Sequence, residues 1–314
     1  MKKVLFLMKI KEAHSDNYTP AMINWYGALE YLGYQVHYED YSNYNAEAFY
    51  ELVKEMKPDY IFHPTYELFH FEFVRLKEFS KVYCIHSDDD WRFDNYVKYW
   101  IPFTDGAIGY QNKEETYLKE GAPRGYYSRA RWAFNPNMMQ YDFTGEKKYG
   151  ITHLGGLHGD KIQRIKKLET RGLKIELIDP KFTSYASYMQ AYDQSTISIC
   201  LTPNSLTYAP QSKTRLAEVP YYCVLASEWW PNMEMWNMEP NKDFILIDDT
   251  GRHLELIDRC LSDKEFSNKM YRSAKKILVS KNTVFHEWDR IMKNIDEDYK
   301  GINIDALIDK FKLL

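Results

Sequence analysis

Short apolar segments alternate with helix-forming segments along most of the chain, and this alternation constrains its fold more than any other feature. In the first half we expect strands at 4–10, 35–38, 60–63, 81–86 and 106–110, separated by helices at 21–32, 46–56, 69–79 and 112–119. After a loop-rich stretch over 121–150 the pattern restarts, with strands at 149–154, 174–178, 195–201, 222–227 and 244–247, and helices at 160–170, 183–193, 211–218, 252–261, 263–279, 284–295 and 304–311. Strands separated by helices form parallel, doubly wound sheets. The prediction is an α/β chain of two Rossmann-like domains facing each other across a cleft, with ligands bound at the carboxyl ends of the strands.

The length of 314 residues suits two domains. We expect an N-terminal domain over 1–145, a C-terminal domain over 146–295, and a tail helix over 296–314 that packs on the N-terminal domain.

Composition and charge exclude several classes of protein. The net charge of −4 gives no general attraction to nucleic acid. The 4 widely spaced cysteines favour free thiols in a reducing compartment over a zinc site. The apolar start is broken by Lys9, and no apolar stretch is long enough to span a bilayer. We therefore expect a cytoplasmic protein.

The segment Gln211–Glu218 concentrates charge at the start of an expected short helix. The free N–H groups and the dipole of a helix N-terminus favour phosphate, and Lys213 and Arg215 would add charge-assisted hydrogen bonds to a diphosphate. Glu218 lies about one turn further along, where its carboxylate could accept hydrogen bonds from ribose hydroxyls. The pattern suits a nucleoside diphosphate that carries a sugar; the alternative is an ordinary helix with a solvated charged face.

A glycine turn after the expected strand 149–154 offers a second anion contact. Gly155 and Gly156 let the backbone approach a ligand closely, and His158, Lys161 and Arg164 stand at or near the start of the next helix. The turn has neither the Gly-Lys-Ser/Thr ending of a P-loop nor the glycine spacing of a dinucleotide fingerprint. It therefore indicates phosphate contact without a standard nucleotide motif.

Candidate catalytic residues follow two strands of the N-terminal domain. Crowded carboxylates raise one another's pKa, which suits a general base acting on an acceptor hydroxyl. The candidates are Asp89 and Asp90, which are preferred as the pair nearest Trp91, then Asp88, His86, and Asp16 with His14. The alternatives are a solvated helix-capping turn and an Asp-x-Asp metal site over Asp88–Asp90.

The stretch from about Tyr149 to Ile295 resembles the CgeB-like (spore maturation protein) type of GT-B glycosyltransferase. The shared features are the strand and glycine turn Thr152–Gly156, the helix start at Lys161, the element Gln211/Lys213/Arg215/Glu218, the apolar run and acidic turn over 223–228, and the segments 244–249 and 283–288. The resemblance implies a GT-B fold, a sugar-nucleotide donor (a UDP-sugar is expected) on the C-terminal domain, an acceptor on the N-terminal domain and no obligatory metal. It also implies that Glu218 binds the ribose and that Arg215 and Lys213 face the diphosphate. The second, upstream Glu of retaining GT-B enzymes is missing, which leaves the stereochemistry open.

The resemblance predicts a hexosyl- or pentosyltransferase and leaves its acceptor open between a cell-surface glycan, a small molecule and a hydroxymethylated base in phage DNA. The small size and the Tyr-, Lys- and Asn-rich composition are typical of phage proteins, and phage DNA glycosyltransferases are also GT-B proteins. DNA would need a groove lined by Arg124, Arg129 and Arg131, and a pocket for a flipped base. A non-catalytic sugar-nucleotide-binding module and a metal-dependent transferase are further alternatives.

Overall fold

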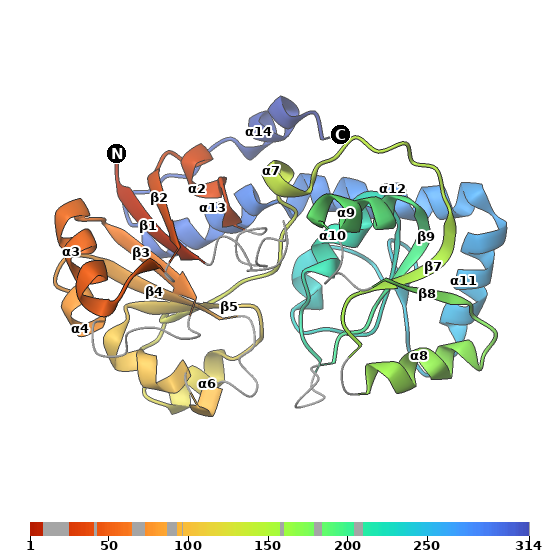
Figure 1. Ribbon diagram of the computed structural model, residues 1–314, viewed down its shortest axis with the longest axis horizontal. Coiled ribbons are helices and arrows are strands. Elements are labelled where there is room, and N and C mark those ends of the chain that lie inside the picture. Colours follow the sequence, from red (N-terminus) through yellow and green to blue (C-terminus); the bar gives the residue numbers. More distant parts are fainter. Residues whose placement is uncertain are drawn as a thin grey trace. The chain divides into compact units, whose positions relative to one another are not determined.

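A computed structural model describes residues 1–8, 25–40, 43–64, 73–86, 93–95, 97–157, 160–178, 184–203 and 210–313. The chain divides into two compact units. Unit 1 comprises residues 1–12, 18–131 and 285–302, and unit 2 comprises residues 13–17, 132–284 and 303–314. Each unit contains one parallel sheet with helices against it (Figure 1). The prediction of an α/β chain with two doubly wound domains is confirmed.

Unit 1 is built on a 6-stranded parallel sheet with the order β2-β1-β3-β4-β5-β6. The strands are β1 (Lys3–Met8), β2 (Gln35–Asp40), β3 (Tyr60–Pro64), β4 (Lys81–His86), β5 (Gly106–Gly109) and β6 (Tyr127–Arg129). The helices between them are α2 (Ala28–Tyr31), α3 (Ala46–Met56), α4 (Phe73–Leu76), the 3₁₀ helix η2 (Val97–Phe103) and α6 (Glu114–Lys119). Phe49 and Val53 of α3 pack on the buried strand residues Leu5 and Ile61. The core of unit 1 thus follows from the apolar face of α3 and the apolar strands beneath it.

A helix from late in the sequence, α13 (Val284–Ile295), completes unit 1. Trp288 is fully buried, and its ring lies 5.6 Å from that of Phe6 and 5.0 Å from that of Phe62, centre to centre. The buried carboxylate of Glu287 accepts a hydrogen bond of 2.9 Å from Nε of Arg131. The return of the chain to the N-terminal unit is therefore held by aromatic packing and by a buried ion pair.

Unit 2 contains a 5-stranded parallel sheet with the order β11-β10-β9-β7-β8. Its strands are β7 (Tyr149–Leu154), β8 (Ile175–Ile178), β9 (Ser195–Cys200), β10 (Val224–Ser227) and β11 (Ile245–Leu246). Its helices are α7 (Pro136–Met139), α8 (Lys161–Glu169), α9 (Tyr185–Asp193), α10 (Arg215–Tyr222), the 3₁₀ helix η4 (Met233–Trp236), α11 (Arg252–Ser262), α12 (Lys264–Lys281) and α14 (Ile304–Phe311).

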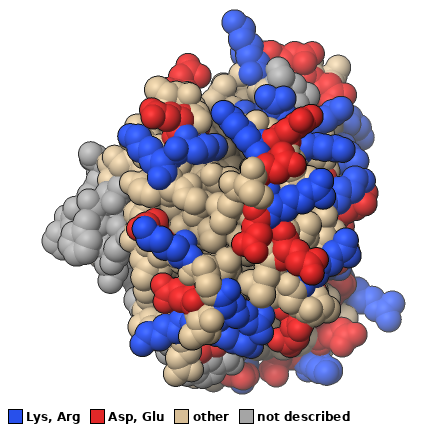
Figure 2. All heavy atoms as spheres, turned by 90° about the vertical axis from the view of Figure 1, so that its right-hand side faces the viewer, with Lys and Arg blue, Asp and Glu red and all other residues tan. Residues whose placement is uncertain are grey.

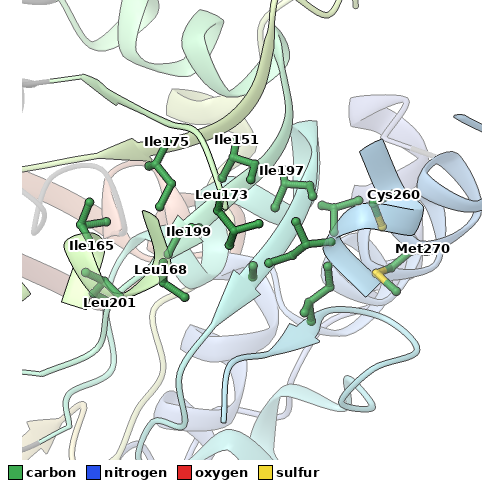
Figure 3. Packing of buried hydrophobic residues seen from close by; sticks show 14 residues of the cluster. Ile151, Ile165, Leu168, Leu173, Ile175, Ile197, Ile199, Leu201, Cys260 and Met270 are labelled. Carbon is green, nitrogen blue, oxygen red and sulfur yellow. The ribbon is translucent and has the colours of Figure 1, made fainter. Parts of the chain in front are cut away.

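The helices of unit 2 cover both faces of its sheet. The crossover from β7 to β8 runs in the opposite direction along the sheet from the crossovers β8 to β9 and β9 to β10. Because parallel crossovers are right-handed, α8 lies on one face and α9 and α10 lie on the other (Figure 1). The α8 face carries an aliphatic core in which Ile165 and Leu168 meet Ile197 and Ile199 of β9 (Figure 3).

The division of the chain differs from the expected boundaries at 145/146 and 295/296. The loop-rich stretch expected over 121–150 contains β6, which adds a strand to unit 1, and the next unit begins at Trp132. The returning segment is 285–302, and α14 belongs to unit 2, where the Gln140 side chain donates to the carbonyl oxygen of Phe311 at 3.3 Å. The difference arises because the apolar face of α13, with Trp288, packs on unit 1.

On the face drawn in Figure 2, acidic and basic side chains are interspersed, with no broad area of a single sign. Such a surface lacks the continuous basic field of a nucleic-acid groove. No helix in the described part of the chain is both long enough and apolar enough to cross a bilayer.

Candidate donor site

The carboxyl end of β7 and the starts of α8 and α10 bring three cations together in unit 2. Lys161 is the first residue of α8, Arg215 is the first residue of α10, and Lys213 precedes α10 by two positions. Burial, and then the positive charges of Arg215 and Lys213, lower the pKa of Lys161 to about 8. The sequence predicted these residues for one site, and the structure places them in one another's electrostatic field.

Lys161, Lys213 and Arg215 are named the cation cluster, and two of them, Lys161 and Arg215, have no paired carboxylate in the described residues. Lys161 is only 7% exposed. Among the residues that the structure describes, no carboxylate lies within 4.0 Å of the Lys161 ammonium or of the Arg215 guanidinium. The amide nitrogen of buried Gln211 has no hydrogen-bond acceptor in that same part of the chain, while its oxygen accepts from Lys213. Burying an uncompensated charge is costly, so the cluster is suited to an anion that brings its own negative charge.

Gly155 lies against Arg215 of the cation cluster, in a backbone conformation that favours glycine. Its φ of +129° lies in a region that other residues rarely adopt, and an added Cβ would stand 1.7 Å from Nη2 of Arg215. The backbone after β7 therefore approaches the guanidinium closely. Gly156 follows directly, whereas His158 lies outside the described residues.

Glu218 is 2% exposed, and tyrosines of α9 surround it. Tyr185 donates to one carboxylate oxygen at 3.5 Å and Tyr192 to the other at 3.4 Å, both long for hydrogen bonds to a carboxylate. Burial, opposed by the charge of Arg215, raises the pKa of Glu218 to about 7. A carboxylate with such weak partners retains the capacity to accept stronger hydrogen bonds from a ligand.

Tyr188 connects Glu218 to the cation cluster. Its hydroxyl accepts a hydrogen bond of 3.3 Å from Nε of Arg215 and lies 3.0 Å from the hydroxyl of Tyr192, to which it can donate while Tyr192 donates to Glu218. Arg215 and Glu218 are thus joined through two buried tyrosine hydroxyls. The sequence analysis missed this network. Tyr188 and Tyr192 follow Tyr185 by three and seven positions, a spacing that places all three on one face of a helix.

His153 is a second group that the sequence analysis did not assign to the site. It is fully buried on β7, and its Nδ1 lies 3.0 Å from the carbonyl oxygen of Ile199, so Nδ1 carries the proton. Burial, and then the charge of Arg215, lower its pKa to about 3. Its Nε2 is a buried acceptor with no hydrogen-bond partner in the described residues. A polar histidine at the end of a buried strand, beside the glycine turn, was the available signal.

The catalytic candidates of the first domain fall mostly outside the description. Asp88, Asp89 and Asp90, and His14 with Asp16, belong to segments that the structure does not describe. His86 is described: it is 2% exposed, and its ring lies 6.0 Å from that of Tyr117. Burial, and then the nearby His63, lower its pKa well below the ordinary range, so His86 is a neutral interior residue.

One of the three arginines expected to line a DNA groove is not available for that role. Arg131 is 8% exposed and paired with Glu287. Over the described residues, no group of three or more His, Cys, Asp and Glu side chains could hold a metal ion. The acidic trio proposed as an alternative metal site lies outside that search.

Comparison in sequence finds no matching family model and no matching curated protein. Comparison in three dimensions finds glycosyltransferases over nearly the whole chain. Anabaena HepE in complex with UDP-glucose superposes with a TM-score of 0.59 at 11% identity, over 95% of this chain and 100% of that one. An α-glucosyltransferase in complex with UDP and a 13-mer DNA containing an HMU base has a TM-score of 0.64 at 10% identity, over 93% and 99%. A glycosyltransferase from Rickettsia africae has a TM-score of 0.59 at 10% identity, over 95% and 99%. The chain has the two-domain GT-B fold of these proteins.

Proposed function

We propose that the protein is a glycosyltransferase that takes a sugar from a UDP-sugar, with the donor held by unit 2. One observation carries the proposal: Lys161 is buried and Arg215 is half-buried beside Lys213, and neither has a carboxylate at ion-pair distance in the described chain. A diphosphate supplies the missing negative charge, and the starts of α8 and α10 present free N–H groups to it. The GT-B fold supports the assignment, since fold neighbours have been solved with UDP or UDP-glucose.

The proposed roles follow from the geometry. The cation cluster and the backbone at Gly155 and Gly156 contact the diphosphate, with His158 as a further contact from the same turn. Gln211 donates its amide hydrogens to the bound UDP-sugar. Glu218 accepts hydrogen bonds from the ribose hydroxyls, which replace its long hydrogen bonds from the tyrosines. Tyr188 accepts a hydrogen bond from Arg215, and His153 lies in the electrostatic field of Arg215 and Lys161, so both help to position the cation cluster.

For the transfer step we propose that one carboxylate of Asp88, Asp89 and Asp90 removes the proton from the acceptor hydroxyl, with Asp16 next in line. Loss of such a base lowers the rate about 10²–10⁴-fold. Asn substitutions in the trio should therefore include one variant that binds donor normally and transfers poorly. Dependence of activity on added divalent cation would favour the metal-site alternative for the trio.

The proposed acceptor is a hydroxyl of a glycan or small molecule. A DNA acceptor is suggested by one fold neighbour, but the net charge of −4 and the buried pairing of Arg131 weigh against it.

The donor assignment is tested by thermal shift with UDP and UMP at equal concentration. A ligand that binds only the native state raises the melting temperature, and the second phosphate should make UDP clearly more effective than UMP. Equal shifts would refute the assignment. Slow hydrolysis of UDP-sugar without acceptor would then distinguish an enzyme from a non-catalytic binding module.

A further inference from the structure

A cavity of about 490 Å³ lies in unit 2 at the carboxyl ends of β9, β10 and β11, between α8 and α11. Its size is that of a small-molecule site. The residues around it include Arg164 of α8, Glu228 and Trp229 after β10, and His253 of α11. No member of the cation cluster lines it, although its lining residues Asp160 and Pro210 stand next to Lys161 and Gln211 in the chain, so the cavity adjoins the proposed diphosphate site without including it.

His253 is a buried polar group in the wall of this cavity. It is 1% exposed, and neither ring nitrogen has a hydrogen-bond partner in the described part of the chain. The nearest charged atom, Oδ1 of Asp248, lies 3.9 Å from Nδ1. Burial, and then the charge of Arg171, lower the pKa of His253, so the ring is neutral and offers one donor and one acceptor. Both nitrogens are buried beneath the cavity surface, so His253 forms part of the wall of the cavity.

The wall beside His253 is already fixed in place. Arg164 donates to Asp160 at 2.6 Å and to Glu228 at 2.5 Å. The other oxygen of Glu228 accepts from the backbone N–H of Thr202 at 3.2 Å. Because these bonds are made within the protein, the wall needs no reorganisation when a ligand arrives.

The charge of the lining favours a neutral ligand. Four carboxylates (Asp160, Glu228, Asp248 and Asp249) stand against three cations (Arg164, Lys167 and Arg171). Such a lining does not attract a phosphate or another anion. A neutral ligand with many hydroxyl groups, by contrast, can donate hydrogen bonds to the carboxylates and accept them from the guanidinium and ammonium groups around the cavity.

Trp229 supplies the apolar component. It is 53% exposed, unusual for so large an apolar side chain, while its carbonyl is held by a hydrogen bond of 2.7 Å from the hydroxyl of Thr202. An indole held by its backbone at the rim of a polar cavity gives a flat face against which the C–H face of a pyranose can pack.

We propose that this cavity binds a short segment of a neutral oligosaccharide, with a sugar ring against Trp229 and its hydroxyls bonded to the carboxylates and cations of the lining. This carbohydrate site goes beyond the proposed donor chemistry and does not depend on it. It makes unit 2 a glycan-binding unit in its own right.

The test uses the full chain with maltotriose and cellotriose as separate probes, each followed by saturation-transfer NMR. We expect at least one probe to bind with a Kd of about 0.1–5 mM, and Trp229→Ala to weaken it at least about tenfold. Tyr99→Ala is the matched control, because Tyr99 is an aromatic residue of unit 1 with a similar exposure of 56%. The control should leave binding unchanged.

Saturating UDP separates this proposal from the donor assignment. Binding of the trisaccharide that persists while UDP is bound supports a separate site; if UDP fails to bind, the donor assignment fails and the loss in Trp229→Ala alone supports the carbohydrate site. Displacement of the trisaccharide by UDP, equal losses in Trp229→Ala and Tyr99→Ala, or no binding of either probe would each overturn the proposal.

Discussion

Replacing Lys161 by Met should make the free protein more stable and the donor complex weaker. The pKa of Lys161 is lowered from 10.5 to about 8, which corresponds to a cost of roughly 3 kcal/mol for keeping the ammonium charged in the folded state. Met has a similar length and no charge, so the free energy of unfolding at pH 7 should rise by roughly 1–3 kcal/mol. Loss of a charged hydrogen bond to the diphosphate should weaken UDP binding by roughly 1.5–3 kcal/mol, or about 10–150-fold.

Urea unfolding without ligand and calorimetric titration with UDP measure the two effects. At Lys161 the unfolded state binds more protons than the folded state between pH 8 and 10.5, so the stability advantage of Lys161→Met over wild type should shrink as the pH rises through this window. Lys166→Met is the matched control, because Lys166 lies on the same helix and is exposed. A Lys161→Met protein that is less stable than wild type, or that binds UDP normally, would refute the argument that the uncompensated charge exists for a ligand.

Three further results are expected. UDP-glucose, whose diphosphate does not titrate near neutrality, should bind more tightly as the pH rises through about 7, where Glu218 ionises, and more weakly above about 8, where Lys161 loses its proton. Glu218→Gln should remove the increase in affinity near pH 7, and an affinity that does not change with pH in calorimetry would contradict both roles. Gly155→Ala should displace the Arg215 guanidinium and weaken UDP binding at least about tenfold, and unchanged affinity would show that the guanidinium does not contact the diphosphate. Trp288→Ala should cost roughly 3–5 kcal/mol in denaturant unfolding, and a loss under about 1 kcal/mol would mean that α13 is held mainly by other contacts.

Much of the fold could be predicted because its signals are local. The sequence predicts α3 and β4 with their observed bounds, since an apolar stripe ends at Lys57-Pro58 and an apolar run ends at His86. The short strand β6 was missed, because three residues, Tyr127–Arg129, carry no readable period. It becomes a strand only by pairing with β5, which is a tertiary effect.

The charged part of the candidate site could be predicted for the same reason, and the buried part could not. Lys161 begins α8, one residue after the expected helix start at 160, whereas Arg215 begins α10 four residues after the expected start at 211. The burial of Glu218 depends on α9 packing against α10, and the unpaired nitrogen of His153 depends on the register of β7 with β9. Neither packing partner lies near its counterpart in the sequence.

The place of α13 in unit 1 has a consequence for how the protein is made. Unit 1 is discontinuous, and its residues 285–302 leave the ribosome only after nearly all of unit 2. Domains generally fold in the order of synthesis. Here the N-terminal sheet cannot complete its packing until Trp288 is synthesised, because Trp288 packs against Phe6 and Phe62. The segment 132–284 of the later unit is continuous and contains its whole sheet, so it can fold before the earlier unit has all of its residues. A chain stopped just before residue 285 would leave an unfinished first unit, and such a fragment should be a client for chaperones or proteases.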